Sequence, residues 1–92
     1  MISGRLNLIG ADIKKVNLVG EYLSGALLIA SDLRGVSLIG TDLIGADLRD
    51  ADLRGANLRE SIFITQAQIN SAKGDISTVI PTSIVRPSHW IE

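Results

Sequence analysis

The chain has 92 residues, of which 46% are apolar but only 3% aromatic, and it contains no cysteine. These values fit one small domain and exclude a disulfide framework or a thiolate metal site, so packed aliphatic side chains and backbone hydrogen bonds must hold the fold. Nine basic and ten acidic residues leave a net charge of −1, which excludes a strong overall field toward nucleic acid.

A five-residue period runs from about Leu6 to Phe63. Its third position is almost always Leu, a mostly small residue stands two positions earlier, Asp or Asn lies between them, and Gly dominates the last position. Since residues two apart share a face of an extended chain, we expect the small residue and the Leu to point inward. The predicted core column comprises Leu8, Ile13, Leu18, Leu23, Leu28, Leu33, Leu38, Leu43, Leu48, Leu53, Leu58 and Phe63.

A period of five matches neither an α-helix nor a continuous strand, but it matches short strands that turn a corner every fifth residue. Glycine suits such a corner because it tolerates positive φ. Asp12, Asp32 and Asp52 recur at twenty residues, which indicates four sides per coil. The sequence therefore predicts an all-β solenoid of about three coils over residues 1–64.

The segments ADLRD, ADLRG and ANLRE at residues 46–60 resemble the A(D/N)LxX consensus of the pentapeptide-repeat family. The resemblance implies a right-handed quadrilateral β-helix with the Leu and the small residue inside. Residues from Thr65 to Trp90 also resemble the tail that closes many bacterial members of the family.

The C-terminal end carries a predicted cap over residues 65–74. Thr65 and Gln68 form a T-x-x-Q capping box at the start of a helix from Gln66 to about Lys73. Gly74 stands where a left-handed residue would end that helix. We expect residues 75–92 to pack on the solenoid as a tail, with Trp90 near the helix.

The N-terminal end has no comparable cap in the sequence. Leu6, Val16 and Glu21 replace the small inward residue there, as an open end would allow. Because an uncovered solenoid end exposes core and strand edges, we expect a protein partner, a second copy stacked head to head, or further coils of a longer solenoid to cover it.

The outward positions predict two different surfaces. Asp12, Asp32 and Asp52 alternate with basic residues two positions later, which indicates a salt-bridged face and not a stripe that binds nucleic acid. Outward aliphatic side chains instead indicate a protein interface or a dimer surface, with scattered apolar surface or contact with the C-terminal tail as the alternative. These candidate interaction residues are Ile9, Val19, Tyr22, Leu27, Ile29, Ile39, Ile44, Ile62 and Ile64.

Nothing in the sequence predicts catalysis, a cofactor or a metal site. The aspartates recur because the repeat recurs, and His89 lies in a Pro-flanked tail without an obvious Ser or Cys partner. No apolar run approaches the ~20 residues of a membrane-spanning helix and no signal-peptide pattern opens the chain, so we expect a cytoplasmic protein without membrane insertion.

These observations predict a non-catalytic structural or protein–protein interaction module. The resemblance implies an alternative, since some family members mimic DNA and regulate DNA gyrase. The near-neutral charge and the small number of coils count against that alternative, and we expect no direct binding of nucleic acid.

Overall fold

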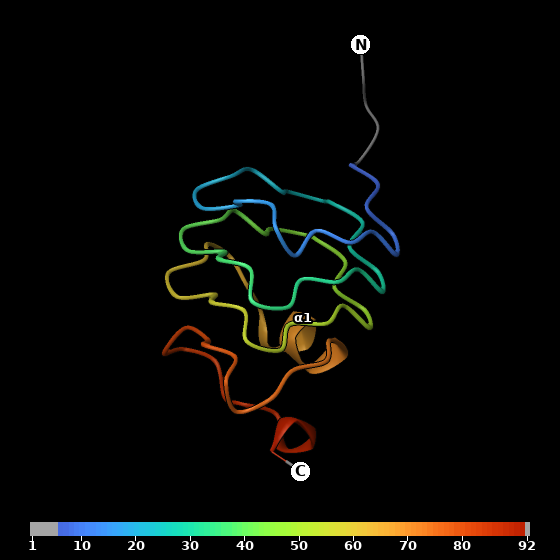
Figure 1. The fold of residues 1–92 in the computed structure, drawn as a ribbon. Helices are drawn as coiled ribbons and strands as arrows, with labels where there is room; N and C mark the ends of the chain where they lie inside the picture. The colour runs from blue at the N-terminus through green and yellow to red at the C-terminus, as the bar shows by residue number, and fades with distance from the viewer. Residues whose placement is uncertain (1–5, 92) are drawn as a thin grey trace.

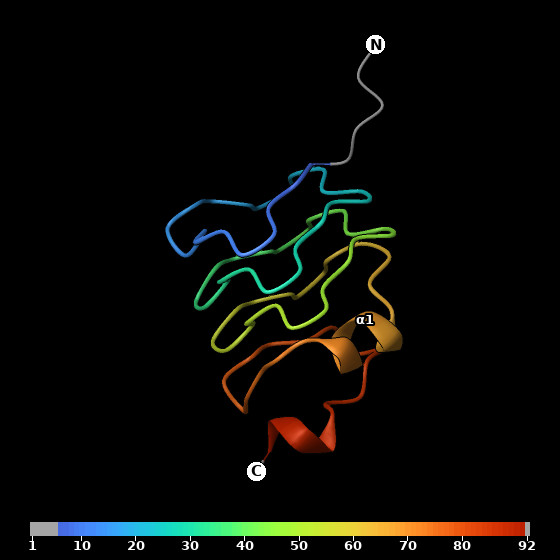
Figure 2. The same ribbon diagram turned by 90° about the vertical axis from the view of Figure 1, so that its right-hand side faces the viewer.

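The computed structural model describes residues 6–91, which wind into stacked coils above a C-terminal cap (Figures 1 and 2). Parallel backbone bridges join residues twenty apart, which confirms the predicted four-sided coil. The bridges within the repeats are Asn7–Leu27, Leu27–Asp47, Asp12–Asp32, Asp32–Asp52, Ser37–Asn57, Tyr22–Asp42 and Asp42–Ile62. Each bridge is single and flanked by turns, so the four sides are held by isolated pairs and not by long strands.

We name the sides in chain order. Side A contains residues 6–10, 26–30 and 46–50, and side B contains residues 11–15, 31–35 and 51–55. Side C contains residues 16–20, 36–40 and 56–60, and side D contains residues 21–25, 41–45 and 61–64. Sides B and D therefore face away from each other.

The corners explain the glycine column. The N–H of each small residue donates to the C=O of the preceding Leu, as from Ala56 to Leu53 at 2.9 Å. The residue before the small one has positive φ in most units, including Gly55 at 73°. A type II turn needs such a residue at its third position, which Gly adopts without steric cost.

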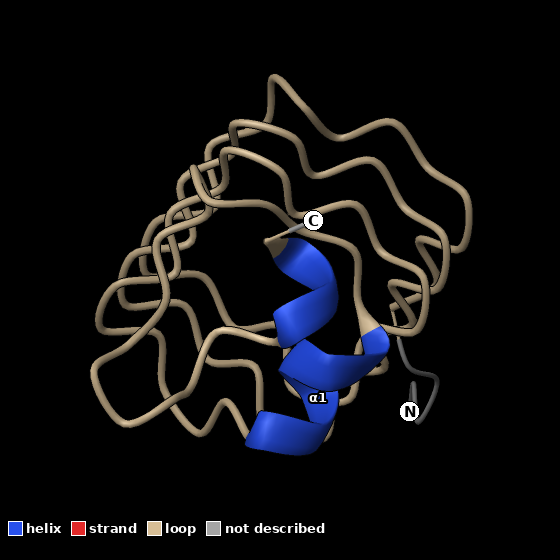
Figure 3. Cartoon of the chain, turned by 90° about the horizontal axis from the view of Figure 1, so that it is seen from below, coloured by secondary structure: helices blue, strands red, loops and turns tan. Residues whose placement is uncertain are grey.

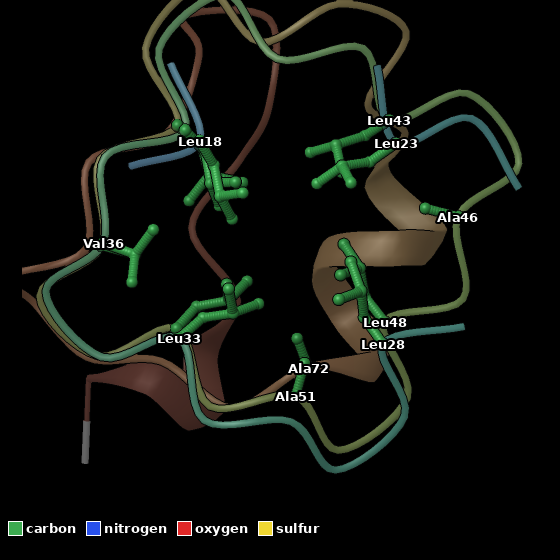
Figure 4. Close-up of a cluster of buried hydrophobic side chains, with 14 of the residues drawn as sticks. Leu18, Leu23, Leu28, Leu33, Val36, Leu43, Ala46, Leu48, Ala51 and Ala72 are labelled. Atoms are coloured by element: carbon green, nitrogen blue, oxygen red, sulfur yellow. The ribbon is translucent and has the colours of Figure 1, made fainter. Parts of the chain in front are cut away.

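The Leu column fills the interior, and its side chains point toward one another across the coils (Figure 4). The prediction is confirmed from Ile13 to Leu58, whose column members are all buried, whereas Leu8 in the first coil is only partly buried. For Phe63 the prediction is wrong: its side chain is 62% exposed and its φ is 63°. The chain leaves the coil at this residue to enter the cap, and Ile64 packs against the core instead.

Helix α1 spans Gln66–Ser71, and the predicted capping box of Thr65 and Gln68 is confirmed. The helix ends before the predicted Lys73, because Ala72 is already extended at φ −97°. Gly74 is not the left-handed terminator that the sequence indicated, since its φ lies outside that region. A Cβ on Gly74 would lie 2.5 Å from the Trp90 ring, so glycine is required here by close packing.

The tail first adds to the stack of coils and then covers the C-terminal end of the solenoid. Lys73 forms a bridge with Asp52 on side B, and Val79 forms one with Asn57 on side C. The short 3-10 helix η1, Ser88–Trp90, then brings the buried Trp90 against the end of the core. Figure 3 shows both helices lying across the mouth of the coils. No helix among residues 6–91 is both long and apolar enough to span a membrane.

Candidate interaction surface

The Asp and Asn column has a local structural role at the corners. In each unit that carries Asp or Asn, its side-chain oxygen accepts a hydrogen bond from the N–H two residues later, as Asp42 does from Ile44 at 3.0 Å and Asn57 from Arg59 at 3.0 Å. Asp and Asn favour turns for this reason. Their outward position in the repeat predicted only exposure to solvent, although the turn preference of Asp and Asn was a usable signal.

Side B carries a network of ion pairs. Arg34 and Arg54 fold back onto Asp32 and Asp52 of their own units at 2.8 and 2.6 Å. Lys14 joins two coils, lying 2.9 Å from Asp12 and 3.0 Å from Asp32. Lys14, Arg34 and Arg54 are thus each paired with carboxylates, so this ladder of charges presents little net positive charge to a phosphate backbone.

The ion pairs lower the pKa values of the side B carboxyl groups. Hydrogen bonds from the Arg34 side chain hold the pKa of Asp32 well below its usual range. The Arg54 side chain lowers the pKa of Asp52 in the same way, and the Lys14 ammonium lowers that of Asp12. These carboxyl groups are therefore committed to structural pairs and are not poised for proton transfer.

The predicted apolar surface is only partly assembled. Its exposed members are Ile9, Val19, Tyr22, Ile44 and Ile62. Its half-buried members are Leu27, Ile29 and Ile39. Ile64 packs against the core, so its predicted outward position is wrong. The exposed residues lie on three sides, and only side D brings several of them together.

We call Tyr22, Ile44, Ile62 and Phe63 the side D surface. Tyr22 and Phe63 are 83% and 62% exposed, and Ile44 and Ile62 are also exposed. Bridges stack Tyr22, Asp42 and Ile62 on successive coils, so the surface spans about 10 Å along the axis. Phe63 was missed because its place in the Leu column outweighed the nearby helix start at Thr65.

Asp42 lies at the middle of the side D surface. Ile44 occupies the position that Arg34 and Arg54 hold in their units, so Asp42 lacks the fold-back cation of the side B aspartates. Within residues 6–91 no ion pair reaches its carboxylate. An apolar surface with one such carboxylate complements a partner that brings a cation among apolar side chains.

A groove of about 490 Å³ lies between the last repeat coil and the tail, lined by Arg59, Glu60 and residues 79–82. Among the residues that the structure describes, Arg59 and Glu60 are the charged ones that line it. In the part of the chain that the structure describes, no three His, Cys, Asp or Glu side chains gather as a metal site would require. The predicted interaction surface therefore remains the candidate site.

The family model for pentapeptide repeats (8 copies) matches residues 7–43 and 22–60, together more than half of the chain. The chain belongs to the pentapeptide-repeat family. Proteins of this family form right-handed quadrilateral β-helices, which agrees with the four-sided coil described above.

The chain is similar to several solved structures, among them those of two pentapeptide-repeat proteins, and to a curated protein. The pentapeptide-repeat protein Rfr23 from the cyanobacterium Cyanothece 51142 is 29% identical, with a TM-score of 0.62 over 80% of this chain and 56% of that chain. The pentapeptide-repeat protein alr5209 from Nostoc PCC 7120 is 31% identical over 86% of this chain and 77% of that chain, with a TM-score of 0.28. The uncharacterized protein YybG of Bacillus subtilis (strain 168) is 59% identical over 30 residues, which cover 33% of this chain and 11% of YybG. The chain thus spans about a tenth of YybG and just over half of Rfr23.

Proposed function

We propose that this protein is a non-catalytic interaction module whose side D surface binds a protein partner. The observation that supports the proposal is the grouping of Tyr22, Ile44, Ile62 and Phe63 around the carboxylate of Asp42. Exposed aromatic side chains are enriched in protein interfaces because they bury a large area at low entropic cost.

The partner is expected to present apolar side chains around a Lys or Arg. Its cation would pair with Asp42, and its apolar groups would cover Tyr22 and Phe63. Removing this carboxylate from water without a cation would be costly, so the same feature would select against acidic partners. Charge thus gives the surface specificity, while the apolar side chains supply affinity.

The alternative function, a DNA-mimic regulator of DNA gyrase, requires a surface rich in free carboxylates. Here Asp32 and Asp52 are each paired with an arginine, and the net charge is only −1. We therefore favour the interaction module. Inhibition or protection of gyrase by this protein in a supercoiling assay would reverse that preference.

The experiment is affinity capture from an extract of the organism that carries the gene. Ile44→Lys should reduce retention of the specific partner at least tenfold, because it places a cation beside the partner's own. Asp42→Asn keeps the hydrogen bond from the Ile44 N–H but removes the charge, and should reduce retention less. Val19→Lys on side C is the matched control, since Val19 is as exposed as Ile44.

Capture that is equal for all three variants, or no specific capture by the wild type, would contradict the proposal. A partner lost only with Val19→Lys would move the interface to side C. Retained folding of each variant is checked by its thermal melting curve.

A further inference from the structure

We propose that the groove between the last repeat coil and the tail binds an acidic segment of a protein partner, whose carboxylate pairs with Arg59 and accepts the backbone N–H of Glu60. The groove is lined by Arg59, Glu60 and residues 79–82, which all lie outside the side D surface. The inference therefore does not depend on the partner proposed for side D.

Arg59 differs from the other arginines of the described repeats. Arg34, Arg49 and Arg54 each fold back onto the Asp two residues earlier, at 2.8, 2.7 and 2.6 Å. Arg59 has Asn57 at that position, whose oxygen accepts the Arg59 backbone N–H at 3.0 Å but brings no charge. Within residues 6–91 no ion pair reaches the Arg59 side chain, which is exposed and lines the groove. Its guanidinium group therefore offers charged donors to an anion.

The corner N–H of Glu60 lacks the partner that other corners have. At such a corner the backbone N–H donates to the coil below, as Gly35 does to Arg54 at 3.0 Å. The register of side C places Pro81 at the corresponding position of the tail, but its oxygen accepts the Ile84 N–H at 3.0 Å instead. No acceptor among residues 6–91 takes the Glu60 N–H, which therefore points toward the groove without a partner from the described chain.

The preceding corner of the same coil shows what fills such a place. Gly55 donates its N–H to the Asp75 carboxylate of the tail, which also accepts the N–H and the hydroxyl of Ser77 at 2.9 and 2.5 Å. Hydrogen bonds from Ser77 and from Gly55 lower the pKa of Asp75, so this group is an anion at neutral pH. At the Glu60 corner no carboxylate from residues 6–91 takes this role. A carboxylate from a partner fits the place by the same geometry.

The groove has the size and the lining of a site for a short segment. Its volume is about 490 Å³, within the range of ~300–1,000 Å³ that is usual for ligand pockets. Val79, Ile80 and Pro81 form its apolar wall, and Val79 is 43% exposed. Figure 1 shows this orange tail segment below the yellow third coil, which carries Arg59. An occupant that suits both walls carries a carboxylate beside an apolar side chain.

The Glu60 carboxylate also lines the groove and opposes a bound anion. Glu60 is exposed, so water and salt screen this repulsion. The charged donors of Arg59 and the corner N–H both favour the anion, because hydrogen bonds between charged groups are stronger than neutral ones. Removing the charge of Glu60 should therefore strengthen binding, whereas removing that of Arg59 should weaken it.

The test is an NMR titration of the full chain with the peptide Gly-Asp-Ile-Ser-Thr-Val. This peptide copies residues 74–79, the segment that brings the Asp75 carboxylate to Gly55. Saturable shifts of the Glu60 amide are expected at millimolar peptide, whereas the Gly55 amide should not move because Asp75 already occupies its corner. The same peptide with Asn in place of Asp should bind about fivefold more weakly.

Three variants of the protein locate the charge that matters. Arg59→Gln should raise the dissociation constant of the Asp peptide about three- to fivefold, as expected for the loss of an exposed ion pair. Arg49→Gln is the matched control, since Arg49 already pairs with Asp47, and should leave the constant unchanged. Glu60→Gln should lower the constant about twofold.

The absence of a saturable shift at the Glu60 amide, or equal affinity for the Asp and Asn peptides, would overturn the inference. So would tighter binding of a peptide with Lys in place of Asp, because the occupant would then be basic. Equal losses for Arg59→Gln and Arg49→Gln would attribute binding to overall charge and would also contradict the site. Melting curves identify any variant that fails to fold. Failure of this site would leave capture of a partner through side D intact.

Discussion

The first and third coils are built from the same repeat but differ in how many contacts their groups make within residues 6–91. In the third coil, Asp52 N–H bonds to Ser31 above, and Leu53 N–H bonds to Lys73 below. In the first coil, the bonds to other coils among residues 6–91 run to the coil below, as from Leu8 N–H to Leu27 and from Ile13 N–H to Asp32. The same contrast holds for side chains, since Leu53 and Leu58 are fully buried whereas Leu8 is only partly buried.

This difference teaches that a repeat draws its stability from its neighbours. An isolated coil cannot bury its own Leu column, and each stacked neighbour supplies hydrogen bonds and apolar contact. The cap acts as a neighbour that differs in sequence. Gln68 shows this directly, because its side-chain amide donates to the oxygens of Leu43 and Ala46 at 2.9 Å each.

The largest expected effect comes from removing the closing side chain. Trp90 is 2% exposed and its Nε1 donates to the Ala72 oxygen at 3.1 Å. Trp90→Ala should lower the free energy of unfolding by about 3–5 kcal/mol, since it leaves a cavity at the end of the core. Denaturant unfolding measures this loss. Trp90→Phe, which keeps an aromatic ring, should lose much less, and equal losses for both variants would show that only the hydrogen bond matters.

A matched pair of leucine substitutions compares the two ends directly. Leu53→Ala should cost about 2–5 kcal/mol because the site is fully buried on both sides. Leu8→Ala should cost about 1 kcal/mol, because part of that side chain already contacts water. Hydrogen exchange should also be faster for amides of the first coil than for those of the third. Equal losses at the two sites would remove the asymmetry that the structure shows.

Corner glycines provide a smaller effect. Gly55→Ala should cost about 1 kcal/mol, because φ is 73° and a left-handed conformation is unfavourable for alanine. A Cβ on Gly55 would make only ordinary contacts of 3.6 Å or more, so backbone strain and not a clash is the cause. Gly10→Ala should change the melting temperature less, since the first coil can open locally. Ala30, at φ 57°, shows that the fold tolerates alanine at such a corner.

The smallest effect is expected from the ion pairs on side B. Asp12, Asp32 and Asp52 have lowered pKa values in the folded protein. Their stabilisation is therefore complete above the unfolded pKa of about 3.9 and declines as the pH falls through the folded values. At pH values below about 4, the melting temperature should decrease. The decrease should be smaller for Asp32→Asn than for the wild type. A melting temperature that stays constant between neutral pH and pH 2 would contradict this assignment.

Much of the fold was predictable because the repeat records one local rule many times. Residues two apart share a face, so the Leu column from Ile13 to Leu58 was assigned correctly. The twenty-residue recurrence of the aspartates indicated four sides, and the bridges confirm them. The capping box was equally legible, since Thr65 and Gln68 interact within one turn of helix.

The errors lie where distant segments decide the outcome. Phe63 obeys the repeat in sequence, but the chain leaves the coil there and turns the ring outward. Gly74 follows a helix, but glycine is required there because the ring of Trp90, sixteen residues later in the sequence, packs against it. The side D surface likewise could not be predicted in full, because the repeat pattern places Phe63 in the core and does not indicate that its side chain is exposed.

The sequence by itself determined the coil, its four sides, its Leu core and the start of its cap. Each of these depends on contacts within one turn of chain or between residues separated by the fixed periods of five and twenty. Only the tertiary structure decided that the tail continues the stack, that Trp90 closes it, and which apolar side chains stay in water. Those features depend on contacts between the tail and the coils, whose sequences share no period. They are therefore decided by the hydrogen bonds and packing that form when the tail meets the last coil.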